Sequence, residues 1–135
     1  MGQNLKRLLQ ECAEQFENNP AFMYLYNGRV REVSFGEFYE NVQSRKAYCG
    51  YLKQKRVGLW AYNSYEWIVT VTALLLAGKT VVLLDANLPD EDMFRLCSYA
   101  DVELIMVDEE TAESEAARQL PTVLLSEKWK GAEEK

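Results

Sequence analysis

Two short stretches contain residue types that could do chemistry, and the first of them ends like a phosphate-binding loop. In such a loop (Walker A), Ala77-Gly78-Lys79-Thr80 would follow a strand and open a helix, so that helix N-terminal amides face the phosphate. Here Ala73 occupies the position of the motif's first glycine, an apolar helical segment comes first, and a strand-like run follows. The order therefore indicates the end of a helix, with Gly78 as its left-handed C-terminal residue.

The second stretch, Val81–Pro89 (VVLLDANLP), is similar to the phosphoacceptor segment of a bacterial receiver domain. A receiver needs an acidic pair after its first strand to hold Mg²⁺ beside the acceptor aspartate. The strand expected at Val57–Ala61 is followed by Tyr62-Asn63 instead, so Asp85 has no means of activation. We interpret Asp90, Glu91 and Asp92 as first-turn residues that offset the helix dipole, because no partner ligands for a metal are identifiable.

Aromatic residues gather near the expected crossing from strand to helix, at Trp60, Tyr62, Tyr65 and Trp67. Such a cluster could stack a planar ligand, although core packing is the commoner use of these side chains. The chain contains no histidine, which removes the usual general base near neutral pH and the commonest zinc ligand. It also contains no GxGxxG fingerprint. These absences leave few ways to activate a nucleophile, and they give a dinucleotide-binding site no support.

Composition restricts the function further. The 135 residues are one domain or one piece of a larger one, and 48% hydrophobic residues suffice for a core. Fifteen basic and twenty-one acidic residues give a net charge of −6, which argues against nucleic-acid binding. Three widely spaced cysteines without a CxxC pair predict reduced thiols and a cytoplasmic location. The apolar stretch Trp67–Leu84 is interrupted at Gly78-Lys79, so we expect a helix and a strand rather than a transmembrane segment.

The elements that must position these residues follow from periodicity and turn signals. Helices are predicted around residues 5–16, with Asn4 as the cap, at 35–52, from Ser64 to about Gly78, and with Pro89 at the first helical position; strands are predicted at 21–26, 29–33, 57–61, 80–84 (as a central strand), 103–107 and 121–125. Asn27-Gly28 predicts a type I′ turn. Ser34 and Glu37 predict a capping box.

The alternation of strands and helices predicts an α/β fold: a layered, mostly parallel sheet with flanking helices, preceded by an N-terminal helix and a β-hairpin. Residues 1–126 are expected to form this unit, and residues 127–135 a polar tail. A sheet that is part of a larger one would leave an unpaired edge, so self-association through an exposed edge is expected of this chain.

Several short motifs follow one another along the chain: Ser34-Phe35-Gly36-Glu37-Phe38, Val57-Gly58-Leu59, Asn63-Ser64, Glu66-Trp67, Leu76-Ala77-Gly78, Val81-Val82 and Asn87-Leu88-Pro89-Asp90-Glu91-Asp92. Their order resembles the N-terminal region of the adenylate-forming (AMP-dependent) synthetases, and most of all the long-chain fatty-acid-CoA ligases. The resemblance covers about Asn4 to Asp108. Tyr62 stands where that family often has a proline, and Leu83-Leu84-Asp85 lacks the proline usual at the end of that strand.

The resemblance implies that the intact enzyme activates a carboxylate as an acyl-adenylate, using ATP and Mg²⁺, and transfers it to a CoA-type thiol. The family's phosphate loop, nucleotide contacts and catalytic lysine all lie beyond the matched region. The resemblance therefore implies no catalytic, cofactor-binding or metal-ligating residue in this chain, which is expected to be inactive scaffold whose partner is the remainder of the synthetase. A stand-alone, non-catalytic α/β protein-interaction module is the alternative.

Overall fold

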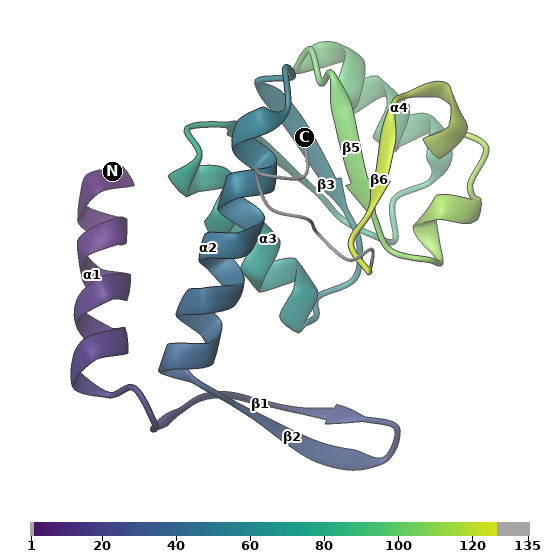
Figure 1. The fold of residues 1–135 in the computed structure, drawn as a ribbon. Coiled ribbons are helices and arrows are strands. Elements are labelled where there is room, and N and C mark those ends of the chain that lie inside the picture. Colours follow the sequence, from purple (N-terminus) through teal and green to yellow (C-terminus); the bar gives the residue numbers. More distant parts are fainter. Residues whose placement is uncertain (1, 127–135) are drawn as a thin grey trace.

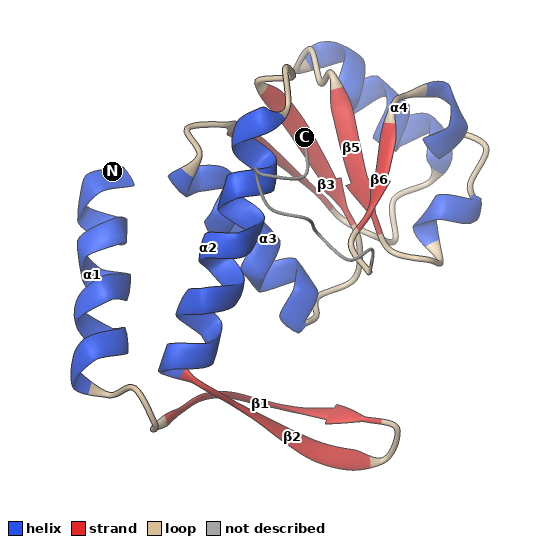
Figure 2. Ribbon diagram, in the orientation of Figure 1, coloured by secondary structure: helices blue, strands red, loops and turns tan. Residues whose placement is uncertain are grey.

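The computed structural model describes residues 2–126 and shows an α/β fold (Figures 1 and 2). The helices are α1 (Gly2–Gln15), α2 (Phe35–Tyr51), α3 (Tyr65–Leu76) and α4 (Asp90–Tyr99), with 3₁₀ turns η1 (Thr111–Glu113) and η2 (Ala117–Gln119). The strands are β1 (Pro20–Tyr26), β2 (Arg29–Ser34), β3 (Arg56–Trp60), β4 (Thr80–Leu84), β5 (Leu104–Val107) and β6 (Thr122–Leu124). The predicted tail at residues 127–135 lies outside the described part.

Strands β3 to β6 form one sheet in the order β4-β3-β5-β6, and every neighbouring pair in it is parallel. Parallel strands need crossover connections, and α3 and α4 lie in those from β3 to β4 and from β4 to β5. Successive strand residues point to opposite faces, and both faces are covered. Val57 and Leu59 pack with α2 and α3, whereas Trp60 packs with Met93 and Cys97 of α4. The predicted layered, mostly parallel α/β fold is confirmed.

The position of β4 corrects one prediction. Among the described residues β4 is an edge strand, paired only with β3, and not a central strand as its apolar run suggested. The run TVVLL reads as buried because both of its faces meet side chains: Val81 packs with the α2–α3 core and Val82 with the α4 core. Covered faces make a strand apolar whether or not both of its edges are paired.

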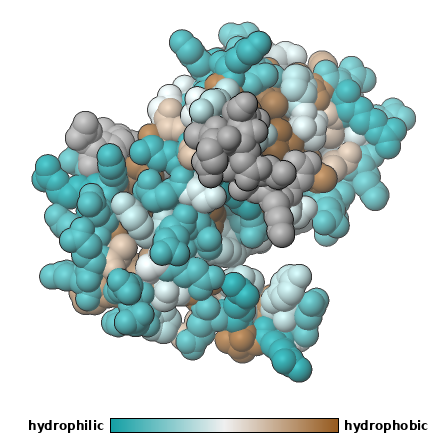
Figure 3. Space-filling view, viewed as in Figure 1, coloured by the Kyte–Doolittle hydropathy of each residue, from teal (hydrophilic) through white to brown (hydrophobic). Residues whose placement is uncertain are grey.

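The β1–β2 hairpin turns at Asn27 and Gly28, which have φ of +51° and +77°. Two positive φ values in succession confirm the predicted type I′ turn. The base of the hairpin packs on α2, with the rings of Phe22 and Phe38 4.8 Å apart. The far half projects beyond the helices (Figure 1), and Val30 is 68% exposed. Figure 3 shows hydrophobic residues on this hairpin among hydrophilic neighbours.

Helix ends agree with the sequence in part. The Ser34 hydroxyl accepts a hydrogen bond from the amide of Glu37 at 3.1 Å, as predicted. The Glu37 carboxylate, however, accepts from Arg31 at 3.0 Å, because an exposed guanidinium on β2 competes for it. Asn4 lies inside α1, which already begins at Gly2, and is not its cap. Pro89 is the N-cap of α4 rather than its first residue.

No helix within residues 2–126 has the length and apolar composition needed to cross a bilayer. The apolar stretch Trp67–Leu84 divides into α3 and β4, as expected. Gly78 ends the helix with a φ of +80°. Its amide donates to the Leu75 carbonyl and the next amide, of Lys79, donates to the Leu74 carbonyl. This pair of bonds is the Schellman motif that glycine favours.

Candidate functional site

A pocket opens at the carboxyl ends of β3 and β4, the edge where parallel α/β sheets bind ligands. Its walls are the loop after β3 (residues 61–63), the end of β4 with the loop after it (residues 83–87), and Trp67 in the first turn of α3. The pocket has a volume of about 540 Å³. In the sheet, β4 lies on one side of β3 and β5 lies on the other. The pocket therefore lies beside the point where the chain reverses the direction in which it adds strands to the sheet.

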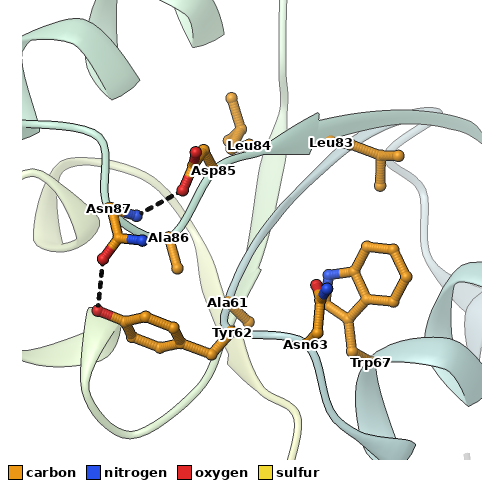
Figure 4. A pocket seen from close by; sticks show the side chains of 9 residues that line it. All are labelled: Ala61, Tyr62, Asn63, Trp67, Leu83, Leu84, Asp85, Ala86 and Asn87. Carbon is orange, nitrogen blue, oxygen red and sulfur yellow. Dashed lines mark hydrogen bonds between the residues drawn. The ribbon is translucent and has the colours of Figure 1, made fainter.

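The polar groups of the pocket are largely engaged with one another (Figure 4). The Tyr62 hydroxyl donates to Asn87 Oδ1 at 3.1 Å, and the Asn87 amide donates to Asp85 Oδ1 at 2.8 Å. Trp67 and Leu83 lie on the opposite side of the pocket. This arrangement offers an apolar wall, a phenol and an amide. It brings no second carboxylate beside Asp85 to form an acid–base pair.

The four aromatic residues expected to cluster are divided among different surroundings. Trp60 is 2% exposed in the α4 core and donates from Nε1 to the Asp85 carbonyl at 2.9 Å. Tyr65 points to the hairpin, where its ring stacks on Tyr24 at 5.5 Å with 7° between planes. Only Tyr62 and Trp67 of the four reach the pocket. The prediction of one cluster is wrong, because strand alternation sends Trp60 to one face and α3 carries Tyr65 on the other.

The acidic residues singled out in the sequence have structural roles in the described chain. Asp85 begins the turn after β4, with its side chain capping the amide of Asn87. Asp90 accepts from the Ser114 hydroxyl at 2.6 Å and so ties α4 to η1. Asp92 Oδ1 lies 3.9 Å from Nη1 of Arg95, which is one turn later on the same helix. All three first-turn acids of α4 occupy the positions that favour negative charge at a helix N-terminus.

Asp108 was not singled out by the sequence, yet it joins the ends of the two central strands. Its Oδ2 accepts from the amide of Tyr62, after β3, and its Oδ1 from the amide of Thr111, both at 2.8 Å. The Thr111 hydroxyl in turn donates to the Trp60 carbonyl at 2.7 Å. The spacing Asp-x-x-Thr after a strand was the available signal, since such side chains commonly bond nearby backbone amides.

Arg45 is the other residue that sequence reasoning missed. It lies on the core side of α2 with Val42 and Cys49, is 9% exposed, and contacts α3 and the residue after β6. Its guanidinium donates to the carbonyls of Glu66 and Leu125 at 3.2 and 3.0 Å, and pairs with the Glu66 carboxylate. Arg45 comes three residues after Val42 and four residues before Cys49, on the apolar side of the predicted helix. This spacing of a charged residue was the available signal.

Burial also determines the state of the thiols. Cys49 is fully buried, and desolvation raises the pKa of its thiol to about 12. Desolvation likewise raises the pKa of Cys97, which is 3% exposed in the α4 core. A thiolate is the reactive form of cysteine. These two residues are therefore packing groups at neutral pH and not nucleophiles.

The described residues do not fit a nucleotide phosphate or its Mg²⁺. Lys79, the cation of the phosphate-loop-like stretch, donates from Nζ to the Leu52 carbonyl at 2.7 Å and so points to the end of α2. The first turns of α3 and α4 contain Glu66 and Asp90–Asp92, whose charge opposes a phosphate there. Within residues 2–126, no three Cys, Asp or Glu side chains converge as a metal site would require.

Comparison with known proteins assigns the family. The AMP-binding enzyme family matches residues 9–134. The mouse long-chain-fatty-acid–CoA ligase ACSBG2 is 29% identical over 126 residues, which are 90% of this chain and 18% of that protein. The zebrafish (Danio rerio) mitochondrial medium-chain acyl-CoA ligase ACSF2 is 31% identical over 77 residues, 55% of this chain and 12% of that protein.

The fold is also found in solved structures. O-succinylbenzoate coenzyme A synthetase (MenE) from Bacillus subtilis, in complex with AMP, superposes with a TM-score of 0.74 at 17% identity. The superposition covers 87% of this chain and 30% of that one. The chain thus spans less than a fifth of the length of the two ligases it matches. The family match over residues 9–134 shows that the chain belongs to the AMP-binding enzyme family.

Proposed function

We propose that this chain is the N-terminal scaffold part of an ATP-dependent, AMP-forming acyl-CoA ligase. The observation that carries the proposal is the asymmetry of the match, which covers 90% of this chain but only 18% of the mouse ligase. In this proposal residues 1–126 form an α/β subdomain segment that supports the enzyme, and three free thiols suit a cytoplasmic location. The remainder of the ligase is the chain's partner.

The intact ligase would join a carboxylate to AMP, releasing pyrophosphate from ATP, and then pass the acyl group to the thiol of CoA. We assign no catalytic, nucleotide-binding or metal-binding residue to this chain. Its part is structural: the hydrogen bonds that Asp108 accepts from the amides of Tyr62 and Thr111 fix the loops at the carboxyl edge of the sheet. Rigid loops at that edge are what a ligand site built by other segments would rest upon.

The first experiment measures the mass of the native gene product in its source cells, with an antibody raised to this chain. A product several times heavier than 15.6 kDa is expected, and the immunoprecipitated protein should show fatty-acid-dependent exchange of pyrophosphate into ATP. Detection of a 15.6 kDa product alone would overturn the proposal. A heavy product without exchange activity for any carboxylate would remove the ligase activity but keep the scaffold role.

The purified 135-residue chain gives the complementary test. Equilibrium dialysis with ATP and Mg²⁺ should show no saturable binding, because Lys79 is engaged at the Leu52 carbonyl and acidic side chains lie at the helix N-termini. Mixing the chain with ATP, Mg²⁺ and a panel of fatty acids should give no pyrophosphate exchange. Carboxylate-dependent exchange by the purified chain would contradict the scaffold assignment.

One observation favours a second candidate, a stand-alone protein-interaction module. Met23, Leu25 and Val30 lie on one face of the hairpin, by their pairing register, and each is more than 60% exposed. Exposed apolar groups gathered on one face mark interaction sites. A 15.6 kDa native product together with a partner protein that Leu25→Lys releases would favour this candidate over the ligase.

A further inference from the structure

β4 presents an edge that is open among residues 2–126. The Thr80 amide donates to the Lys55 carbonyl at 2.9 Å, toward β3. The sides to which backbone groups point alternate along a strand, so Val81 and Leu83 direct their N–H and C=O groups to the open side. The strand contains no charged residue, proline or bulge. Natural edge strands use those devices to prevent pairing with another chain, and β4 has none of them.

The side chains next to this edge are apolar. Leu83 is 58% exposed and lies with Trp67 on the same side of the pocket in Figure 4. Helix α3, which covers this face of the sheet, carries no charged residue after Glu66, and Leu75 on it is 36% exposed. A helix bordering solvent normally has a polar outer face. The edge and the helix beside it therefore have the composition of an interface.

We propose that β4 pairs antiparallel with β4 of a second copy of this chain, about a two-fold axis at Val82. In this register Val81 of each copy lies opposite Leu83 of the other, and these are the residues whose backbone groups face outward. The two pairs exchange four backbone hydrogen bonds and continue the sheet across both copies. An interface of this kind is isologous, so one surface satisfies itself.

Charge at the two ends of β4 selects this antiparallel arrangement. Lys79 precedes the strand and Asp85 follows it, and the register about Val82 places Lys79 of each copy opposite Asp85 of the other. Val81 and Leu83 share one face of β4 by alternation. Lys79 and Asp85 flank the strand by one residue at either end, and on dimerisation each exchanges its present partner, the Leu52 carbonyl or the Asn87 amide, for the opposite charge of the second copy. Parallel pairing of two copies in equal register would instead set lysine beside lysine. Like charges directly opposite each other destabilise a strand pair.

The inference concerns the 135-residue chain by itself and does not depend on the ligase proposal. Sedimentation velocity over a range of micromolar concentrations should show a monomer–dimer equilibrium. Because a single strand pair is a small interface, the dissociation constant of the dimer should lie in the micromolar range. Leu83→Lys should abolish the dimer. Val30→Lys, at a similarly exposed apolar residue of the hairpin, is the matched control and should leave it intact.

Charge exchange tests the register. Either Lys79→Asp or Asp85→Lys alone places like charges opposite each other at both ends of the strand pair. Each single variant should weaken dimerisation about tenfold. The double variant Lys79→Asp/Asp85→Lys restores opposite charges and should return the affinity close to that of the parent chain. The existing bonds of Lys79 to Leu52 and of Asp85 to Asn87 are lost in the double variant too. Rescue would therefore report pairing between copies and not repair of the single copy.

Amide hydrogen exchange provides a measurement that needs no variant. The amides of Val82 and Leu84 face β3 and should be protected at every concentration. Those of Val81 and Leu83 should become protected only as the dimer forms. A chain that stays monomeric at high concentration would overturn the inference. A dimer lost in Val30→Lys but not in Leu83→Lys, or one without rescue in the double variant, would do so as well.

Discussion

Arg45 donates from Nη1 to the hydroxyl of Thr70 over 2.8 Å, across the buried contact between α2 and α3. Thr70 is fully buried, and its hydroxyl also donates to the Glu66 carbonyl one turn earlier. The same guanidinium reaches the carbonyl of Leu125, beyond β6. One side chain therefore joins α2 and α3 to the residue that follows β6, although Arg45 and Leu125 are 80 residues apart in the sequence.

Replacement of Arg45 should destabilise the fold. Arg45→Met keeps an unbranched apolar stem but is shorter than arginine and leaves the carbonyls of Glu66 and Leu125 without this donor. Hydrogen bonds from a charged donor contribute about 1.5–3 kcal/mol each, and we expect a loss of about 2–3 kcal/mol in the free energy of unfolding. Urea denaturation followed by circular dichroism measures the change. Lys46→Met on the same helix is the control, expected within about 0.5 kcal/mol of the parent; an equal loss in both variants would contradict the role of Arg45.

Gly58 gives a prediction about packing at the centre of the sheet. A Cβ atom there would lie 3.2 Å from methyl groups of Ile105, Leu84 and Val102. Gly58→Val should overpack this site and cost about 1–3 kcal/mol of stability. Gly50→Ala is the matched control, since no atom lies within 4 Å of its Cβ position in α2. Alanine should stabilise that helix by about 0.5–1 kcal/mol, and thermal denaturation of both variants checks the opposite signs.

Local chemistry explains which features the sequence predicted correctly. The positive φ values at Asn27 and Gly28 follow from the turn type that Asn-Gly favours. The bond from Glu37 to the Ser34 hydroxyl follows from the preference of serine for helix N-termini. The glycine at the end of α3 is of the same kind. Each depends on residues within about one turn of each other, so the sequence pattern contains the whole interaction.

Features that depend on distant segments were predicted poorly. The edge position of β4 is set by which strands pair with β3, and an apolar run does not encode this. The Glu37 carboxylate binds Arg31 of the hairpin instead of Ser34, since a neighbouring element competes for it. For the pocket, the sequence identified Tyr62 and Trp67 but grouped them with Trp60 and Tyr65. The direction in which each aromatic ring points depends on the packing of strand and helix faces.

The three cysteines should differ in reactivity toward a thiol reagent. Cys12 is partly exposed, whereas Cys49 and Cys97 are buried with raised pKa values. At pH 8 the folded chain should react rapidly at one thiol and the chain in denaturant at three. Peptide mapping after brief alkylation identifies the site. Rapid labelling of Cys49 in the folded chain would contradict its burial.

Cys49 also predicts a loss of stability in alkaline solution. In the unfolded chain its thiol ionises with a pKa of about 8.5, whereas the folded value is about 12. Between these values the unfolded chain has released the proton and the folded chain has kept it, so stability falls as the pH rises. Below the unfolded pKa the contribution is fully present. Denaturation midpoints from pH 8 to 10.5 should fall less steeply in Cys49→Ala, and an unchanged slope would contradict this assignment.

Glu103 predicts the corresponding effect in acid. Its carboxylate accepts hydrogen bonds from the amides of Arg56 and Lys55 at 3.0 and 2.8 Å. These bonds lower the pKa of the carboxyl below its ordinary value, with the bond from Arg56 contributing most. The stabilisation is present above the unfolded pKa and is lost as the pH falls through the folded pKa, because the unfolded chain binds its proton first. Denaturation midpoints between pH 6 and 3 should therefore fall more steeply in the parent than in Glu103→Gln. Glu40→Gln, on the exposed side of α2, controls for the change in net charge and should follow the parent. Parallel curves for the parent and Glu103→Gln would show that the two hydrogen bonds from backbone amides do not hold the loop before β3.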